Sequence, residues 1–547
     1  MKQPSRWALL LLLLLALAFV SIANVREFNP DDESLYVHIA KEMYGKGELW
    51  IPSWCGSEAY FKPPLVYWIL MTGFMMGGVS LVAARIPIVL LTLATVLLAF
   101  LIAKDLYGKR DGVLAALFTA TSLGIIIYGR IAMMDLPLCF FITLSAWCFI
   151  RALDTAHPFW TVAFLAAGGL STLIKGPISL VIILSAAFTC CLIFKRHRHI
   201  LNGWFVAGAA AALFFMLLWP AVLAMRGEFS HWYGFFIVRE NLGKFSDIRY
   251  PVHTFLASYL IYLFPWTPLL ISSLWILIRE KLYREERLMV PLIWAAAVLV
   301  MHLLPATKLK HYTIPAIPLT MVFISAMAGS WGADRAMKRG IIALQALLVL
   351  LFIVFAAAAR TGTTWGDILL AGGALVALLA SWRTSGGKDG LSAGAFFYGA
   401  ALLCILPFIG NHSFERLPQG ALPHLEGKVA AVRIQIYIHT YFLGRPVEQI
   451  DNPVDFNRVL QEGGRVIISE TDFDEFGAVR GFKLAPVEKI YSWKQWRTAM
   501  PLPIILEAFL KGDTAPLIDT IHVVRLKKQK EPGLPVPGSF TSCLSPT

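Results

Sequence analysis

Residues 29–68 read NPDDESLYVHIAKEMYGKGELWIPSWCGSEAYFKPPLVYW. The segment begins just after the first apolar run of the chain with three consecutive acidic residues, Asp31, Asp32 and Glu33. It ends near a lysine, Lys62, that is followed by two prolines. Charged groups at membrane depth are costly and tend to mark a functional site. Because the surrounding sequence is almost entirely apolar, the segment predicts a polar site at the surface of a membrane protein.

The composition indicates a protein that crosses the membrane many times. Of the 547 residues, 57% are hydrophobic and 15% are charged, and the mean hydropathy is +0.65. A soluble domain has about 25% charged residues. The net charge of +13 does not indicate binding of nucleic acid. Its Lys and Arg residues lie in short clusters between apolar runs, which is the pattern that orients membrane proteins.

The sequence contains about thirteen apolar runs that approach the ~20 residues needed to cross a bilayer as a helix. The first run, Trp7–Asn24, follows two basic residues and is interpreted as an uncleaved signal anchor. Another run, Pro64–Val79, is short and opens with two prolines, so it is interpreted as a helix at the membrane interface. The predicted spans are Trp7–Asn24, Leu81–Ala103, Gly112–Tyr128, Leu136–Leu153, Phe159–Ile174, Ile178–Phe194, Trp204–Ala224, His253–Ile278, Leu288–Leu304, Tyr312–Trp331, Ile341–Ala358, Ile368–Trp382 and Ala393–Ile409.

The basic residues of the loops predict the orientation of these spans. If Met1 is cytoplasmic and Pro64–Val79 does not cross, nearly every compact basic cluster faces the cytoplasm, as the positive-inside rule requires. The acidic segment and the ionisable ends of several other spans then share the opposite face. This convergence predicts a cavity that opens to the exterior.

The composition changes near Asn411 to an ordinary density of charge. Short strand-like runs and one amphipathic segment predict a small α/β domain on the external side. The predicted domains are a membrane domain over 1–410 with an external first loop over 25–80, an α/β domain over 411–530, and a loose tail over 531–547. The strand-like runs are Val429–Ile434, Val447–Ile450, Arg465–Ser469 and Ile521–Leu526, and the amphipathic segment is Val454–Gln461.

Asp32 and Lys62 are the two strongest candidates for a chemical role in the first loop. Asp31 and Glu33 fit the first turn of a helix, where acidic side chains complement the helix dipole. A carboxylate that faces cations in a half-dry pocket can instead act as a general base. Asp32 is expected to face a lysine and an arginine in this way. Lys62 either extends to the interface as an ordinary membrane lysine or binds a phosphate as a point charge.

Three further charged residues lie at predicted outer ends of spans. Arg130 and Asp135 bound two spans and either pair at the membrane surface or face the same cavity as Asp32. Lys175 precedes Gly176-Pro177. Like Lys62, it is therefore a basic residue followed by a turn that proline stiffens. Placed on the face that carries Asp32, Asp135 becomes a second acid of the predicted site.

An aromatic segment, Trp232–Phe245, carries Arg239, Glu240 and Lys244. It is typical of an amphipathic interfacial helix, which could fold over a lipid-linked substrate. Farther along, His311 and Tyr312 end an external loop. His311 is not expected to bind a metal, because no second ligand lies three or four residues away.

Several short motifs follow one another in a fixed order: Asp32-Glu33-Ser34-Leu35-Tyr36, Lys62-Pro63-Pro64-Leu65, Ala84-Arg85-Ile86-Pro87, Met134-Asp135-Leu136-Pro137, Lys175-Gly176-Pro177, Phe264-Pro265-Trp266, Lys308 to Pro315 and Tyr441 to Pro446. As an ordered set they resemble the integral-membrane glycosyltransferases of the protein O-mannosyltransferase type, which have the GT-C fold. Within that family the resemblance is closest to the bacterial transferases that attach aminoarabinose to lipid A. The chain departs from the pattern at Phe61, where many relatives have Glu, and over Glu240-Asn241 and Lys244, where relatives carry Glu-His-x-x-Arg.

The resemblance implies an α-helical polytopic membrane protein with about 13 transmembrane helices, interfacial helices and a soluble periplasmic α/β domain. It also implies a glycosyltransferase of the bacterial inner membrane that is active on the periplasmic face. The protein is expected to be a monomer. The donor would be a sugar on undecaprenyl phosphate, and the acceptor would be lipid A or another envelope molecule. Transfer to a protein hydroxyl, or a transporter of lipid-linked sugars, are the alternatives. No cofactor is predicted, and a divalent cation is left open.

The residues expected to carry this chemistry fall into three groups. Asp32 and Asp135 are the predicted catalytic carboxylates. The donor phosphate and lipid are expected to contact five cations: Lys62, Arg239, Lys244, Arg130 and Lys175. The substrate-binding candidates are Glu33, Tyr36, Glu240 and Tyr312.

Overall fold

The computed structural model describes residues 31–155, 157–245, 251–329, 346, 350, 427–432, 447–450, 453–462, 464–469, 484–493 and 518–526. The chain divides into two compact units. One comprises Met1–Phe414 with Trp496–Leu517, and the other comprises Glu415–Gln495 with Ile518–Thr547. The described part of the first unit is almost wholly helical, and the second unit holds a five-stranded sheet.

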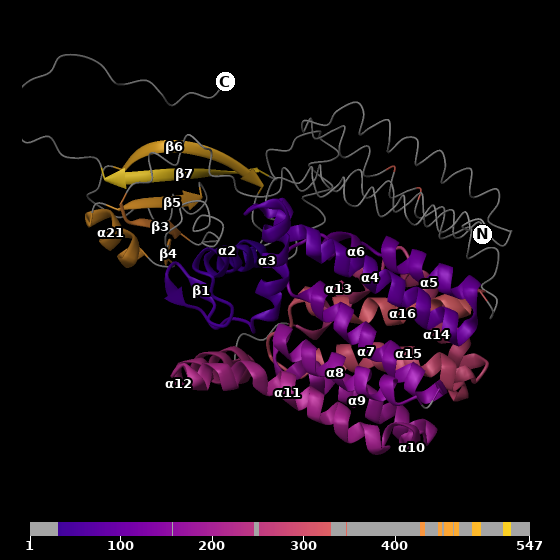
Figure 1. Cartoon of the computed structure of the whole chain (residues 1–547). Helices are drawn as coiled ribbons and strands as arrows, with labels where there is room; N and C mark the ends of the chain where they lie inside the picture. Colours follow the sequence, from indigo (N-terminus) through magenta and orange to yellow (C-terminus); the bar gives the residue numbers. More distant parts are fainter. Residues whose placement is uncertain are drawn as a thin grey trace, which may run out of the picture. The chain divides into compact units, whose positions relative to one another are not determined.

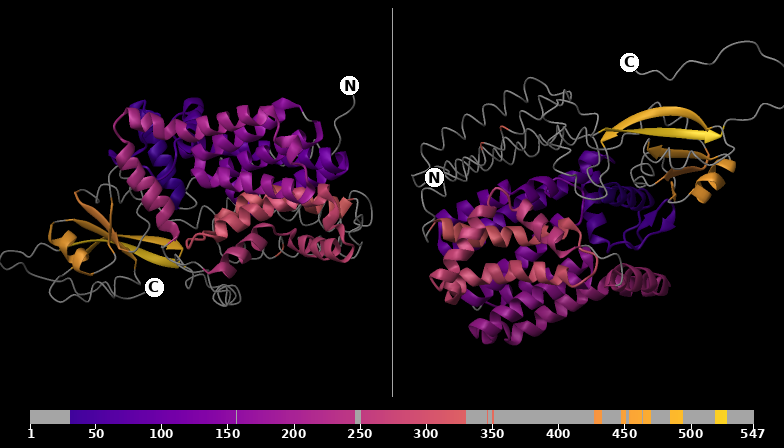
Figure 2. Two further views of the ribbon diagram at one scale, coloured as in Figure 1. Left: turned by 90° about the horizontal axis from the view of Figure 1, so that it is seen from below. Right: turned by 180° about the vertical axis from the view of Figure 1, so that it is seen from behind.

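The helices of the first unit lie side by side in one bundle (Figures 1 and 2). Helix α4 packs against α5 and α7, α8 packs between α7 and α11, and α15 joins α9 to α16. The elements are α2 (Asp31–Lys46), β1 (Ser53–Trp54), β2 (Ser57–Glu58), α3 (Leu65–Gly77), α4 (Leu81–Tyr107), α5 (Lys109–Thr121), α6 (Leu123–Tyr128), α7 (Asp135–Thr155), α8 (Pro158–Lys175), α9 (Pro177–Phe194), α10 (His197–Ile200), α11 (Gly203–Met225), α12 (Phe229–Trp232), η1 (Tyr233–Leu242), η2 (Gly243–Phe245), α13 (Val252–Tyr262), α14 (Thr267–Arg279), η3 (Leu282–Arg284), α15 (Glu286–Leu303), η4 (Lys310–Ala316) and α16 (Ile317–Gly329).

Seven helices in the described residues are long and apolar enough to cross a membrane, or eight if one bent pair counts as a span. They confirm a multi-pass helical membrane protein. Two predicted spans are interrupted: Gly112–Tyr128 breaks at Ser122 between α5 and α6, and His253–Ile278 bends by 104° between α13 and α14. The predicted spans Trp7–Asn24, Ile341–Ala358, Ile368–Trp382 and Ala393–Ile409 lie outside the described residues.

The two interruptions contact each other. The Leu123 backbone N–H donates to the Phe264 carbonyl at 2.9 Å, and the Trp266 indole N–H donates to the Thr121 hydroxyl at 3.2 Å. Pro265 lies in the second break and has no N–H with which to continue a helix. Backbone groups freed inside a membrane need partners within the protein. The second break therefore supplies an acceptor for one freed backbone N–H of the first, and the first break supplies an acceptor for the buried Trp266 indole.

Helix α3 covers the segment predicted to lie at the interface. It has 13 residues and is therefore about 20 Å long, which is short of the ~30 Å of a hydrocarbon core. The chain then turns at Gly78, whose φ of +73° favours glycine, and enters α4. The length of α3 agrees with the prediction that Pro64–Val79 does not cross.

Replacing Gly73 by alanine is expected to destabilise the packing of α3 on α4. A Cβ at Gly73 would lie 1.9 Å from the Ala83 carbonyl oxygen, and a backbone atom cannot rotate away. Overpacking of this kind costs about 1–3 kcal/mol or more. Gly45→Ala is the matched control, since Gly45 is also helical and has no atom within 4 Å of the added Cβ. Thermal unfolding of the purified protein should show a lower Tm for Gly73→Ala and an unchanged or higher one for Gly45→Ala.

The second unit contains a mixed sheet with the strand order β4-β3-β5-β7-β6. Strand β3 pairs in parallel with β4 and β5, whereas β7 pairs antiparallel with β5 and β6. The α21 side chains Phe456, Val459 and Leu460 pack on buried residues of the sheet. The elements are β3 (Val429–Val432), β4 (Glu448–Ile450), α21 (Pro453–Gln461), β5 (Arg465–Ser469), β6 (Leu484–Trp493) and β7 (Ile518–Leu526).

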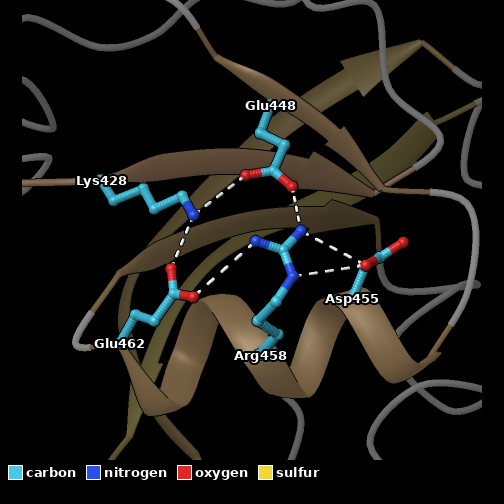
Figure 3. Close-up of polar contacts among 5 residues, drawn as sticks. All are labelled: Lys428, Glu448, Asp455, Arg458 and Glu462. Atoms are coloured by element: carbon cyan, nitrogen blue, oxygen red, sulfur yellow. Dashed lines mark hydrogen bonds and ion pairs between the residues drawn. The ribbon is translucent and has the colours of Figure 1, made fainter.

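The exposed face of α21 carries a network of charges that ties the helix to the sheet (Figure 3). Arg458 pairs with Glu448 and lies 3.3 Å from Asp455, and Lys428 lies 2.6 Å from Glu462 and 3.3 Å from Glu448. Exposed ion pairs contribute little to stability. The buried apolar face of α21 therefore holds this helix in place, and the network fixes its register.

Candidate active site

Helix α2 brings the first set of candidate residues to one place. Asp32 and Tyr36 are four residues apart and so share a face of the helix. Burial, and next the charge of Asp32, raise the pKa of Tyr36, with smaller contributions from Tyr67, Asp135 and Tyr312. The Tyr36 ring centre lies 6.2 Å from that of Tyr67 on α3, and the Tyr36 hydroxyl lies 3.9 Å from the Met134 sulfur just before α7.

Asp135 is the centre of a buried polar cluster at the start of α7. Its side chain is fully buried, with Oδ1 3.6 Å from Lys175 Nζ and Oδ2 3.9 Å from His311 Nε2. Within the described residues, neither carboxylate oxygen accepts a hydrogen bond. Lys175, the last residue of α8, places its ammonium group 3.6 Å from the centre of the Tyr312 ring. The cluster is compensated in charge, yet it keeps hydrogen-bonding capacity for a polar ligand.

Lys62 forms an ion pair with Glu240. Lys62 Nζ lies 3.2 Å from Glu240 Oε2, and both side chains are largely buried. Glu240 lies on the π-helix η1, which packs against the first loop through an edge-to-face contact between Phe61 and Phe235. Burial raises the pKa of Tyr67, and the charges of Glu240 and Asp32 add to this effect.

Arg239 and Lys244, two further cations predicted to contact the donor, lie in different elements. Arg239 is exposed on η1 and its guanidinium lies 5.2 Å from the centre of the Phe235 ring. Lys244 lies in η2, and its side chain lies outside the described part of the structure. Arg239 directly precedes Glu240 and Lys244 follows it by four residues, so both belong to the segment whose Glu240 pairs with Lys62.

A separate buried cluster contains Arg130, Glu33 and Arg85. The expected contacts of Arg130 with the donor phosphate or lipid and of Glu33 with the substrate stay predictions. Arg85 Nη2 and Nε lie 2.6 and 2.7 Å from the two carboxylate oxygens of Glu33. The Ala132 backbone N–H also donates to Glu33, at 2.7 Å. Burial and then the charge of Arg85 lower the pKa of Arg130 to about 10. Glu33 is thus occupied by protein groups that join α2, α4 and the turn before α7.

Three residues of these clusters were missed by the sequence-based prediction. Arg85 lies within a predicted span, and an ionisable residue at such a depth is a signal that could have found it. His311 was considered only as a metal ligand, whereas it contacts Asp135. Tyr67 had no sequence signal, because tyrosines are common in interfacial helices.

Comparison with known proteins supports the predicted resemblance to the GT-C glycosyltransferases. The family model described as dolichyl-phosphate-mannose-protein mannosyltransferase matches residues 61–222. An uncharacterized protein of Aquifex aeolicus is 26% identical over 349 residues, which cover 63% of this chain and 68% of that protein. The undecaprenyl phosphate-alpha-4-amino-4-deoxy-L-arabinose arabinosyl transferase of Pseudomonas aeruginosa is 27% identical over 333 residues. This match spans 59% of each of the two chains.

The crystal structure of ArnT from Cupriavidus metallidurans bound to undecaprenyl phosphate superposes with a TM-score of 0.69. The superposition covers 94% of this chain and 97% of ArnT, at 16% sequence identity. The chain has the GT-C fold. The predicted fold class is confirmed, as is the resemblance to the GT-C glycosyltransferases, whose named relatives use lipid-linked donors. The chemical roles of individual residues in this GT-C protein stay predictions.

Proposed function

We propose that this GT-C protein transfers a sugar from an undecaprenyl-phosphate donor to a hydroxyl of lipid A or another cell-envelope acceptor. The bond between the sugar C1 and the phosphate oxygen breaks, and a bond between C1 and the acceptor oxygen forms. The acceptor hydroxyl loses its proton to a protein base, and undecaprenyl phosphate leaves with the bonding electrons. The observation that carries the proposal is the burial of Asp135 beside Lys175 and His311, together with the largely buried Lys62–Glu240 pair.

Lys62 is the proposed ligand of the donor phosphate. A leaving phosphate gains negative charge in the transition state, and an ammonium group in a half-dry site stabilises that charge. The donor phosphate would share Lys62 with Glu240, which lies 3.2 Å away and fixes the direction of the lysine. Arg239 and Lys244 lie on either side of Glu240 in the chain and are proposed to approach the phosphate from the η1 side.

The acceptor and the sugar are proposed to lie between Asp32 and the Asp135 cluster. Asp32 is partly exposed, so it can reach a bound hydroxyl and take its proton. Asp135 is held by Lys175 and His311 and is proposed to orient polar groups of the sugar, with Tyr36 and Tyr312 beside it. The aminoarabinose of the named relatives makes an amino sugar the first donor to try.

We place the active site on the periplasmic face of a bacterial inner membrane, with the N-terminus in the cytoplasm. The basic loops support this orientation. We also propose a membrane domain over 1–410, a periplasmic α/β domain over 411–530 and a tail over 531–547, in a protein that acts as a monomer. Transfer to a protein hydroxyl and transport of a lipid-linked sugar are the competing functions.

A panel of donors distinguishes these functions. The purified full-length protein would be given several undecaprenyl-phosphate sugars with lipid A, and loss of donor would be followed by chromatography. A glycosyltransferase consumes at least one donor and releases undecaprenyl phosphate, whereas a transporter leaves every donor intact. Consumption that requires a peptide acceptor in place of lipid A would assign the chain to protein glycosylation.

Lys62→Ala is expected to lower kcat/KM for the donor by about 10- to 100-fold, because a charge-assisted hydrogen bond to phosphate contributes roughly 1.5–3 kcal/mol. Lys62→Arg keeps the charge and should retain more activity. Lys41→Ala removes an exposed lysine of α2 and should leave the rate unchanged. Equal rates for Lys62→Ala and Lys41→Ala would contradict the phosphate role.

Labelling of Cys55 tests the orientation of the first loop. Burial and then the charge of Glu42 raise the pKa of Cys55 to about 11, so the reactive thiolate is scarce at neutral pH. In a variant whose only cysteine is Cys55, the rate of maleimide labelling in spheroplasts should rise about tenfold per pH unit between pH 7 and 9. Glu42→Gln should label faster at pH 7. Labelling that appears only after the cells are opened would place this loop in the cytoplasm.

A further inference from the structure

Two carboxylates and an imidazole from separate segments meet away from the proposed active-site residues. Glu58 ends β2, Glu228 directly precedes α12, and His231 lies in α12. His231 Nδ1 lies 3.0 Å from Glu58 Oε2 and 4.0 Å from Glu228 Oε2, and one ligand atom from each residue lies within 4.8 Å of the others. We propose that these three side chains bind a divalent transition-metal ion of the zinc type. The proposal goes beyond the glycosyltransferase function and does not depend on it.

The distances fit a tetrahedral ion. Zinc binds imidazole nitrogen and carboxylate oxygen at about 2.0–2.1 Å, which places neighbouring ligand atoms about 3.3 Å apart. The 3.0 and 4.0 Å separations lie on either side of this value, so small rotations of side chains suffice. Glu58 and His231 are exposed, and Glu228 is partly exposed. An ion can therefore enter from solvent, and water can occupy the fourth position.

The charge of the cluster favours a cation. Among the residues that the structure describes, Glu58 and Glu228 have no ion pair with a lysine or an arginine, and His231 is their nearest basic group. Like charges on carboxylates held this close repel each other. A divalent ion would offset this repulsion. The combination of one imidazole and two carboxylates suits zinc better than calcium or magnesium, which prefer oxygen ligands alone.

Tyr60 supports the two carboxylates from behind. Its hydroxyl lies 3.1 Å from Glu228 Oε2 and 3.4 Å from Glu58 Oε2, and its ring makes an edge-to-face contact with His231. Hydrogen bonds of this kind orient carboxylate ligands of metal ions.

A second group of similar residues does not have free ligand positions. His38, Glu42 and Cys55 also lie close together. The Glu42 carboxylate, however, already accepts hydrogen bonds from the backbone N–H groups of Cys55 and Gly56 and from the Ser53 hydroxyl. Glu42 therefore holds the turn between β1 and β2, and a metal there would have to break these bonds.

An ion at Glu58, Glu228 and His231 would join the first loop to the start of η1. Lys62 follows Glu58 by four residues, and Glu240 follows His231 on the continuous segment α12–η1. The same two segments meet again at the Lys62–Glu240 pair. The ion would therefore fix the register of the two segments at a second point.

Metal content of the purified full-length protein tests the site. The protein, freed of its affinity tag and stripped with chelator, would be equilibrated with micromolar ZnCl2, desalted and analysed by mass spectrometry for zinc. One zinc per chain is expected for the wild type, together with a Tm that rises by a few degrees on addition of zinc. Glu58→Gln and His231→Ala should each lose this zinc and the shift in Tm.

Two variants serve as controls. His157→Ala removes another exposed histidine, and His38→Ala removes the histidine of the other cluster, so both should keep one zinc. A wild type that holds no more zinc than His231→Ala would overturn the proposal. Loss of zinc in His38→Ala but not in His231→Ala would do so as well. Equal binding of calcium at the same concentration would overturn the assignment of a transition metal.

Discussion

Asp32→Asn is expected to lower the rate of donor consumption by about 10³-fold, within the 10²- to 10⁴-fold range that a general base contributes. Asparagine keeps the shape of the side chain but cannot accept the proton of the acceptor hydroxyl. The measurement is the single-turnover loss of an undecaprenyl-phosphate sugar at saturating acceptor. Binding of the donor should change little, since Lys62 and not Asp32 is the proposed phosphate ligand.

Asp31→Asn provides the matched control for this prediction. It removes an adjacent carboxylate that the sequence assigns to the helix N-terminus, and the rate should stay within about threefold of the wild type.

Asp135→Asn is informative in another way, because Asp135 is fully buried between Lys175 and His311. Loss of Asp135 should mainly raise KM for the donor sugar. If Asp32→Asn keeps full turnover and Asp135→Asn does not, the base is Asp135.

The fold was largely predictable because its signals are physical and local. The uninterrupted spans at α4, α7, α8, α9, α11 and α15 follow from length and hydropathy alone. The breaks at Ser122 and Pro265 were not predicted, because each is stabilised by contacts with the other and hydropathy is blind to such pairing. In the sheet, β6 was missed, since Pro486 and two charged residues disguise a strand that gains its order from pairing with β7.

The candidate site was predictable only in part. The loop charges predict which ionisable residues share one face of the membrane, and the structure pairs two of them with residues far away in sequence, Lys62 with Glu240 and Asp135 with Lys175. Which charges pair with one another could not be inferred. Arg130 and Asp135 are near neighbours in sequence, yet Arg130 lies beside Glu33 and Arg85 while Asp135 contacts Lys175. Those partners are set by helix packing over separations of many residues.

The buried pair of Arg85 and Glu33 is expected to have the largest effect on stability. Both side chains are almost wholly inaccessible, at 1% and 0% exposure. Arg85→Met should lower the free energy of unfolding by about 3–5 kcal/mol, because it removes the buried partner that contacts both Glu33 carboxylate oxygens. Arg279→Met is the control, since Arg279 also pairs with a glutamate, Glu280, but both are about half exposed. The control should cost less than about 1 kcal/mol in thermal unfolding.

A double-mutant cycle then separates the cost of an unpaired charge from a loss of packing. Glu33→Gln in the Arg85→Met background removes the stranded charge and keeps an acceptor for the Ala132 N–H, so it should restore at least about 1 kcal/mol. Simple additivity of the two single variants would mean that Arg85 acts through its packing alone. Because Glu33 adjoins Asp32 on α2 and bonds to the turn before Asp135, the single variants should also lower turnover. The double variant should recover turnover and Tm together, since both depend on how α2 is held against that turn.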